Sequence, residues 1–248
     1  IWTSVLFGCA GFTSVLNERT LSIEKSNIYS TNTDILFENI KKRNEIGTLF
    51  IELSTRRRFR INGTAQSTKN AIEVSIKEAY QNCPKYIQQR VANIQEYHSS
   101  KAVIEKGITI NEEIKDWIIN SDTFFIGSRS DNNKLDASHR GGNTGFIEII
   151  DKTLKIPDFK GNSMYNTLGN VLQNSKAGLL FIDFEKGNTL QLTGKSNILF
   201  DQNSEEDLKK TGGTGRFLLF NIEKWLITKN HHKVRWNFLS NSPFNPTF

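Results

Sequence analysis

The sequence is poor in the residues that mark disulfide-stapled folds, metal centres and membrane spans. It has two cysteines, Cys9 and Cys83, and four histidines with no HExxH pattern in 248 residues, so a disulfide framework and a metal site are not expected. No apolar run reaches the roughly 18 residues that cross a bilayer. We therefore expect a protein of the reducing cytoplasm, without metal and without membrane attachment.

What the sequence does contain is enough apolar material for a sizeable core. Hydrophobic residues make up 37% and charged residues 23% of the chain, which is ordinary for one large or two small soluble domains. The net charge is +6, and its densest cluster is RRRFR at 56–60, a run that is most simply a solvated strand face. Because basic residues are not interleaved with exposed aromatics, we expect no nucleic-acid partner.

The chain carries an internal repeat of domain size. GTLFIELSTRRRFRINGTA (47–65) aligns without gaps with GLLFIDFEKGNTLQLTGKS (178–196), and upstream 11–23 matches 145–156. Two copies of a long unit indicate a duplicated domain rather than a solenoid.

The repeat also accounts for the apolar N-terminus. Residues 1–12 (IWTSVLFGCAGF) look like a lipoprotein leader, but no basic region precedes them, and their counterpart in the repeat is 135–146. The second copy has a β-rich run before this segment at 122–130, and the first copy has none. We expect a strand and hairpin of about ten or more residues to be missing there.

Periodicity and composition divide the chain into three parts. We expect a first copy at 1–74, a helical connector at 75–121 and a second copy at 122–248, in a mainly β fold with helices (α+β). The run 177–184 is apolar at nearly every position, which predicts a strand buried on both faces. Closure into a barrel would bury such strands without free edges.

Helices are expected in all three parts. One helix per copy is predicted, at 33–44 and at 163–174, the latter with Asn162 or Ser163 as N-cap. In the connector the predicted helices are 75–90, 93–105 and 111–120.

One strand end and one helix start of the second copy are suited to hold a ligand. A strand ends in Ser138, His139 and Arg140 before a glycine pair, and residues 157–170 run from another strand end into a helix. Helix N-termini attract phosphate, arginine binds phosphate as a fork, and glycine lets a flat ring approach the backbone. A tight turn, a helix cap and an exposed asparagine stripe explain the same pattern, and spacing alone favours this plainer interpretation.

Together these segments resemble a known family. DASHRGGNTGF (136–146), LKIPDFKGNSMYNTLGN (154–170), NCPKYIQQR (82–90) and SPFNP (242–246) resemble the pyridoxamine 5′-phosphate oxidase-related, FMN-binding split-barrel family, in particular its flavin-nucleotide-binding branch. The resemblance covers the whole chain. It implies two split β-barrels in tandem that form an intramolecular pseudo-dimer, with FMN at their interface and further homodimerisation left open.

The resemblance also implies which residues hold the cofactor. They lie on the strand along the flavin, on the strand edge against the ring, and in the phosphate-facing turn and helix start: Ser138, His139, Arg140, Gly141, Pro157, Asp158, Asn162, Ser163, Asn166 and Thr167. The oxidases of the family have basic residues near 166–167, where this chain has Asn and Thr, so Arg140 is left as the main positive charge. The first copy lacks this signature, and we expect it to be a partner wall from which Arg56, Arg57 and Arg58 either reach the ligand or remain solvated.

The function implied by the resemblance is that of an FMN-dependent oxidoreductase. FMN would accept a hydride or electrons from a small-molecule substrate or donor and pass them to oxygen or another acceptor. No catalytic residue is assigned, and His139 is the one candidate acid or base near the ring. The alternatives are a flavin carrier or sensor without turnover, and a haem-binding split barrel, which would need an axial histidine.

Overall fold

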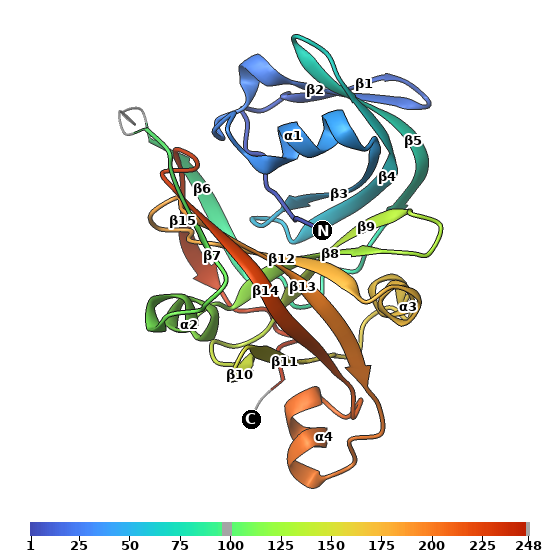
Figure 1. Cartoon of the computed structure of the whole chain (residues 1–248), viewed down its shortest axis with the longest axis vertical. Coiled ribbons are helices and arrows are strands. Elements are labelled where there is room, and N and C mark those ends of the chain that lie inside the picture. Colours follow the sequence, from blue (N-terminus) through green and yellow to red (C-terminus); the bar gives the residue numbers. More distant parts are fainter. Residues whose placement is uncertain (96–100, 247–248) are drawn as a thin grey trace.

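The structure is a computed structural model that describes residues 1–95 and 101–246. It is mainly β, with the first copy above the second in Figure 1. The first copy forms a five-stranded antiparallel sheet. Its strands follow the order β1 (Thr13–Asn17), β2 (Thr20–Glu24), β5 (Ala71–Gln81), β4 (Arg57–Ser67) and β3 (Glu45–Glu52), with the helix α1 (Ile35–Lys42) and a 3-10 turn (Lys25–Asn27) between β2 and β3.

The second copy forms the larger sheet. The strand order is β10 (Glu148–Ile150), β11 (Thr153–Pro157), β14 (Phe217–Lys229), β13 (Thr189–Leu199), β12 (Lys176–Ile182), β8 (Thr123–Arg129) and β9 (Leu135–Gly141), with β7 (Val103–Gly107) added to β14. Three helices accompany it, α2 (Glu112–Ile119), α3 (Asn166–Gln173) and α4 (Glu205–Thr211), and a separate ribbon pairs β6 (Gln89–Ile94) with β15 (Val234–Ser240).

The backbone confirms the duplication strand by strand. The order β1-β2-β5-β4-β3 repeats as β10-β11-β14-β13-β12. Both copies also shift register at the same glycine, Gly63 in β4 and Gly194 in β13. A Cβ at either glycine would lie 2.0 Å from a backbone oxygen of the next strand, so both copies need glycine at this bulge. The expected tandem of two split barrels is therefore confirmed, although neither sheet closes on itself.

The two copies meet through reciprocal contacts. A Cβ at Gly47 of β3 would lie 2.7 Å from the backbone of β9, and a Cβ at Gly178 of β12 would lie 2.6 Å from the backbone of Ile1. Because 47 and 178 are equivalent positions in the repeat, each copy lays its leading segment across the same strand of the other. This reciprocity is that of an intramolecular pseudo-dimer.

The same arrangement explains why β12 is apolar throughout. Leu179 and Phe181 belong to the main core of the second copy, whereas Leu180 and Ile182 pack against apolar residues of the first copy. The expected burial of both faces is thus confirmed, because one face covers the barrel core and the other the interface.

The structure corrects the helical connector expected at 75–121. Residues 71–81 form β5, 89–94 form β6 and 103–107 form β7, and α2 is the helix that this part contains. The predicted helix 93–105 also includes residues 96–100, which lie outside the described residues. Helix-forming residues in 75–81 are overridden because β5 pairs with β2 and β4. The expected boundary at 74 falls inside β5, so we propose that the first copy extends to Gln81.

Other helix predictions have mixed outcomes. Those at 33–44 and 111–120 are confirmed by α1 and α2, which begin after the side-chain caps Asp34 and Asn111. The prediction of a helix start at 163 is wrong, because α3 begins at Asn166 after Tyr165 in a left-handed conformation and has no side-chain cap. No helix of the described residues is long and apolar enough to span a membrane.

Candidate functional site

All ten residues expected to hold the cofactor line one small cavity where the two copies meet. Its volume is about 100 Å³, and its wall combines β9, β11 and the turn before α3 with Arg58 and Arg60 of the first copy. Pockets for small molecules usually measure about 300–1,000 Å³. The cavity is smaller than these pockets, so a ligand of nucleotide size would fit only if a wall moved.

Arg140 shares a carboxylate with a second arginine. Its Nη1 lies 2.7 Å from Oδ1 of Asp158, and Nη2 of Arg216 lies 3.0 Å from Oδ2 of the same group. Asp158 is buried, whereas the two arginine side chains are 23% and 22% exposed. The trio carries one net positive charge. Sequence reasoning missed Arg216, which lies just before β14 and meets Asp158 because β14 pairs with β11.

His139 is buried against an arginine of the first copy. Nη1 of Arg58 lies 3.2 Å from Nδ1 of His139, and Nε of Arg58 donates to the carbonyl of Cys83 at 2.8 Å. Burial, reinforced by the neighbouring arginines, holds the pKa of His139 well below its ordinary value. The imidazole is therefore neutral around pH 7.

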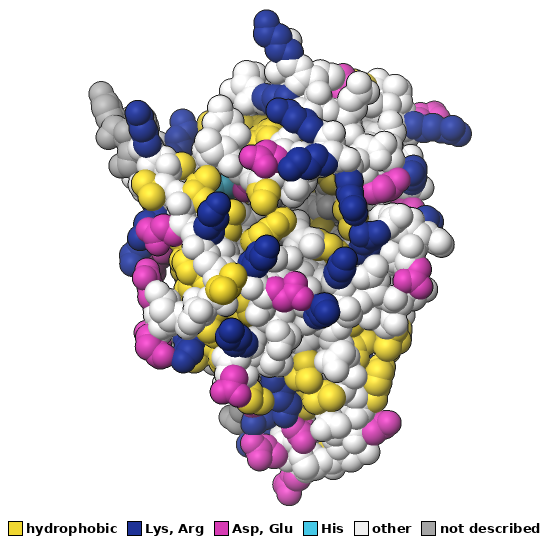
Figure 2. Space-filling view, in the orientation of Figure 1, with side chains coloured by type: hydrophobic (Ala, Val, Ile, Leu, Met, Phe, Trp, Pro, Cys, Tyr) yellow, Lys and Arg dark blue, Asp and Glu magenta, His cyan; other side chains and the backbone are white. Residues whose placement is uncertain are grey.

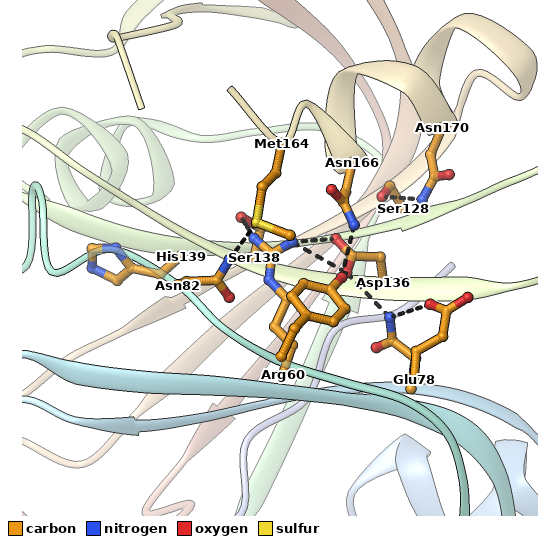
Figure 3. A network of polar contacts seen from close by, with 12 residues as sticks. Arg60, Glu78, Asn82, Ser128, Asp136, Ser138, His139, Met164, Asn166 and Asn170 are labelled. Carbon is orange, nitrogen blue, oxygen red and sulfur yellow. Dashed lines mark hydrogen bonds and ion pairs between the residues drawn. The ribbon is translucent and has the colours of Figure 1, made fainter. Parts of the chain in front are cut away.

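A polar network that includes residues of the cavity wall joins the two copies (Figure 3). Arg60 pairs with Asp136 at 3.2 Å and donates to Oγ of Ser138 at 2.6 Å. Tyr80 donates to Asp136 at 3.0 Å, and Asn166 donates to the Tyr80 hydroxyl at 2.7 Å. Burial raises the pKa of Asp136 and that of Tyr80. Two residues expected to touch the cofactor, Ser138 and Asn166, are thus held in place by the first copy.

The turn before α3 forms the exposed wall of the cavity. Ser163 and Tyr165 have φ of 63° and 45°, a conformation that costs a non-glycine residue free energy. The turn is held from outside, because the Tyr86 hydroxyl donates to the carbonyl of Lys160 at 2.9 Å. Thr167, by contrast, is buried within α3. A strained, exposed turn is the part of the wall best suited to move when a ligand enters.

The three arginines of the first copy have different roles. Arg58 crosses the interface to His139 and lines the cavity, and its contact with a ligand stays a prediction. Arg56 instead donates to Ser240 Oγ at 2.7 Å and to the carbonyl of Ile87 at 2.9 Å, so it clamps the C-terminal strand. Arg57 is exposed, as the solvated alternative expected.

The glycine expected to approach the ligand has a further role. A Cβ at Gly141 would lie 2.2 Å from the carbonyl oxygen of Tyr86. This position needs glycine because the segment at 82–90 packs directly on β9 there. This packing could have been expected from the sequence, because NCPKYIQQR (82–90) is one of the segments that carry the family resemblance.

A larger hollow of about 1770 Å³ lies elsewhere, between α1, β3 and residues 1–8. None of the ten expected residues lines it. Figure 2 shows hydrophobic side chains between Lys and Arg side chains over this face. In the described residues β3 ends its sheet, whereas the equivalent edge of β12 pairs with β8. The hollow follows from this open strand edge rather than from a convergent set of polar groups.

Solved structures resemble this chain in fold. No protein-family model matches it, and no curated protein does. Among solved structures, a histidine-to-alanine variant of HupZ from Group A Streptococcus matches 47% of this chain and 98% of its own, at 20% identity and a TM-score of 0.39. A putative pyridoxamine 5′-phosphate oxidase from Lactobacillus delbrueckii matches 47% of this chain and 93% of its own, at 15% identity and a TM-score of 0.38. An FAD-binding protein from Mesorhizobium loti matches 52% of this chain and 99% of its own, at 10% identity and a TM-score of 0.37. The structural neighbours thus include a protein of the family that the sequence resembles, and each corresponds to about half of this chain.

Proposed function

We propose that this chain binds FMN in the cavity between its two copies and works as an FMN-dependent oxidoreductase. The observation that carries the proposal is a set of buried side-chain nitrogen atoms without a hydrogen-bond partner, in residues that line one cavity: Nε of Arg60, Nε2 of His139 and Nε of Arg140. A buried donor without a partner is costly. A planar ligand rich in acceptors would satisfy such donors.

The charges at the cavity, together with Arg216, which pairs with the lining residue Asp158, suit a phosphate. Arg140 and Arg216 are partly exposed and share one carboxylate, so each keeps donor capacity for an anion. The first turn of α3 has no acidic residue and no side-chain cap, which leaves its N–H groups available. These features fit the phosphate of FMN.

The residues would bind and orient the cofactor while the flavin supplies hydride and electron transfer. Arg140 and the start of α3 would hold the phosphate. Phe146, Phe159 and Leu168, which line the cavity, would exclude water from the ring. The turn containing Ser163 and Tyr165 would open on entry, since the cavity of about 100 Å³ is smaller than usual ligand pockets.

The proposal is tested by absorbance of the purified protein, followed by titration with FMN. We expect flavin bands or saturable uptake of FMN in the wild type. Arg140→Ala should bind about 10–100-fold more weakly, from the ~1.5–3 kcal/mol of a hydrogen bond to a charged group. Arg57→Ala is the matched control, because it removes the same charge from an exposed position. A wild-type protein that takes up no FMN would refute the proposal.

One observation favours a second candidate, a flavin carrier or sensor without turnover. The cavity leaves little space for a substrate beside the cofactor. Anaerobic mixing of the FMN-loaded protein with NADH or NADPH separates the two candidates. Bleaching of the flavin bands supports the oxidoreductase and a small-molecule electron donor, whereas stable bands support the carrier. The two free cysteines support a reducing location, which we propose is the cytoplasm.

A further inference from the structure

We propose that Arg58, a residue of the first copy, fixes His139 as the neutral tautomer protonated at Nε2, and that this N–H is a donor presented to an acceptor atom of the bound ligand. The part about the ligand rests on the proposed function. The part about the tautomer does not, and it applies to the protein without ligand. The inference makes the first copy a positioning element of the site and not only its wall.

The position of Arg58 makes Nδ1 of His139 a hydrogen-bond acceptor. Arg58 is held at two points, because its Nε donates to the carbonyl of Cys83 at 2.8 Å and its Nη2 lies 3.6 Å from the Cys83 sulfur. Its Nη1 then faces Nδ1 of His139 at 3.2 Å and the His139 carbonyl at 3.4 Å. A guanidinium has donors and no acceptor. Nδ1 must therefore accept, and a neutral ring then carries its proton on Nε2.

The surroundings of His139 keep the ring neutral. The charged groups that face it are the arginines of three strands, Arg58 on β4, Arg140 on β9 and Arg90 on β6. Another side is covered by Phe125, whose ring stands edge-on at 5.6 Å between centroids. Among the described residues no carboxylate forms an ion pair with His139. Burial together with these arginines lowers the pKa of His139 well below its ordinary value.

The remaining N–H of His139 has no partner in the protein. Nε2 is buried and makes no hydrogen bond, yet the residue lines the cavity with Arg140 and Asp158. A neutral N–H donor at this place favours a ligand that offers a carbonyl oxygen or an unprotonated nitrogen. Because the pKa of His139 lies below its ordinary value, this preference would be independent of pH above the ordinary histidine pKa of about 6.5.

The tautomer is read from nitrogen-15 NMR of histidine-labelled protein, with the His139 signals assigned through His139→Gln. In the free wild type we expect Nδ1 to have the shift of an unprotonated nitrogen and Nε2 that of a protonated one, without change from the ordinary histidine pKa of about 6.5 up to pH 8. Arg58→Met should raise the pKa of His139 and mix the tautomers. Arg58→Lys should restore the wild-type pattern, because a lysine also only donates, and Arg57→Met is the control for loss of a neighbouring charge. The signal of buried His231 reports whether each variant is folded.

Addition of FMN tests the ligand part. Binding should shift the Nε2–H signal of His139. His139→Leu should weaken FMN binding about tenfold, the value of one hydrogen bond. His139→Gln keeps a donor and should weaken FMN binding less. A free protein protonated at Nδ1, or a ring that titrates near neutral pH, overturns the tautomer. Tight binding that leaves the Nε2 signal unmoved overturns the donor role. Absence of any FMN uptake refutes the proposed function and the ligand part, and the tautomer is still decided in the free protein.

Discussion

The ion pair between Arg60 and Asp136 is the interaction whose loss has the most predictable cost. It joins β4 of the first copy to β9 of the second, and the two side chains are 7% and 5% exposed. Arg60→Met keeps much of the side-chain volume and leaves the carboxylate buried without its cation. Breaking a buried pair in this way costs about 3–5 kcal/mol of stability. The matched control is Lys134→Met, whose partner Glu78 is 42% exposed, and it should cost at most about 1 kcal/mol.

The loss should depend on pH in one direction. Burial already raises the pKa of Asp136, and Arg60 opposes that shift, so its removal raises the pKa further. The native state then holds a proton that the unfolded state releases, and stability falls as pH rises above the ordinary aspartate pKa. We therefore expect the deficit of Arg60→Met to be larger at pH 7.5 than at pH 5, both of which lie above the ordinary aspartate pKa of about 3.9.

Urea unfolding of the wild type, Arg60→Met and Lys134→Met at both pH values measures these differences. The double variant Arg60→Met/Asp136→Asn should recover part of the loss, because a neutral amide leaves no buried charge and can keep the hydrogen bond from Tyr80. The reasoning is refuted if Arg60→Met costs no more than Lys134→Met, or if its deficit shrinks as pH rises.

Three further predictions concern single positions. Gly47→Ala should destabilise the protein by about 1–3 kcal/mol, since its Cβ would lie 2.7 Å from the backbone of β9, whereas Gly161→Ala meets nothing within 4 Å; equal melting temperatures of the two variants would contradict this. Asp158→Asn frees the two arginines that share it and should raise the affinity for inorganic phosphate several-fold by calorimetry, since charge-assisted contacts contribute about 1.5–3 kcal/mol; weaker binding would show that the carboxylate is needed to orient them. His231 has a lowered pKa because it is buried. As pH falls below about 6.5, the unfolded state therefore binds a proton that the native state does not, and stability falls by up to about 1.4 kcal/mol per pH unit. His231→Gln should reduce this pH dependence in urea unfolding, and an unchanged dependence would show that His231 is not its source.

Those parts of the fold that depend on local pattern could be predicted from the sequence. The repeat was visible at β3–β4 and β12–β13 because these strands keep their apolar positions and the glycine bulge. The run at 177–184 predicted burial on both faces because no polar side chain interrupts it. The family resemblance supplied the site residues, and the fold brings all ten to one cavity. Whether they bind FMN stays a prediction.

Parts that depend on partners distant in the chain could not be predicted. β5 carries lysine, glutamate and alanine at its exposed end, a composition typical of helices, and only pairing with β2 and β4 makes it a strand. α3 begins three residues later than predicted because Ser163 and Tyr165 have positive φ. Serine and tyrosine do not indicate positive φ in a sequence. Arg60 and Asp136 are 76 positions apart, and Arg216 meets Asp158 only through the register of β11 and β14.

One hydrogen bond across the interface occurs at equivalent positions of both copies, with a charged donor in one case and a neutral donor in the other. Arg60 of the first copy donates to Oγ of Ser138 in the second copy at 2.6 Å. At the equivalent place, Gln191 of the second copy donates to Oγ of Ser4 in the first copy at 2.9 Å. The contact across the interface is kept, and the charge is lost.

The N-termini of the equivalent helices α1 and α3 also differ in charge. In the first copy the carboxylate of Asp34 accepts from the Leu36 amide and from Ser4 Oγ, so the start of α1 already holds an anion of the protein. The start of α3 has no such cap and no acid in its first turn. Because a helix N-terminus favours negative charge, the first copy satisfies its own helix, whereas the second leaves that place to a ligand, which supports the proposal of one phosphate site per chain.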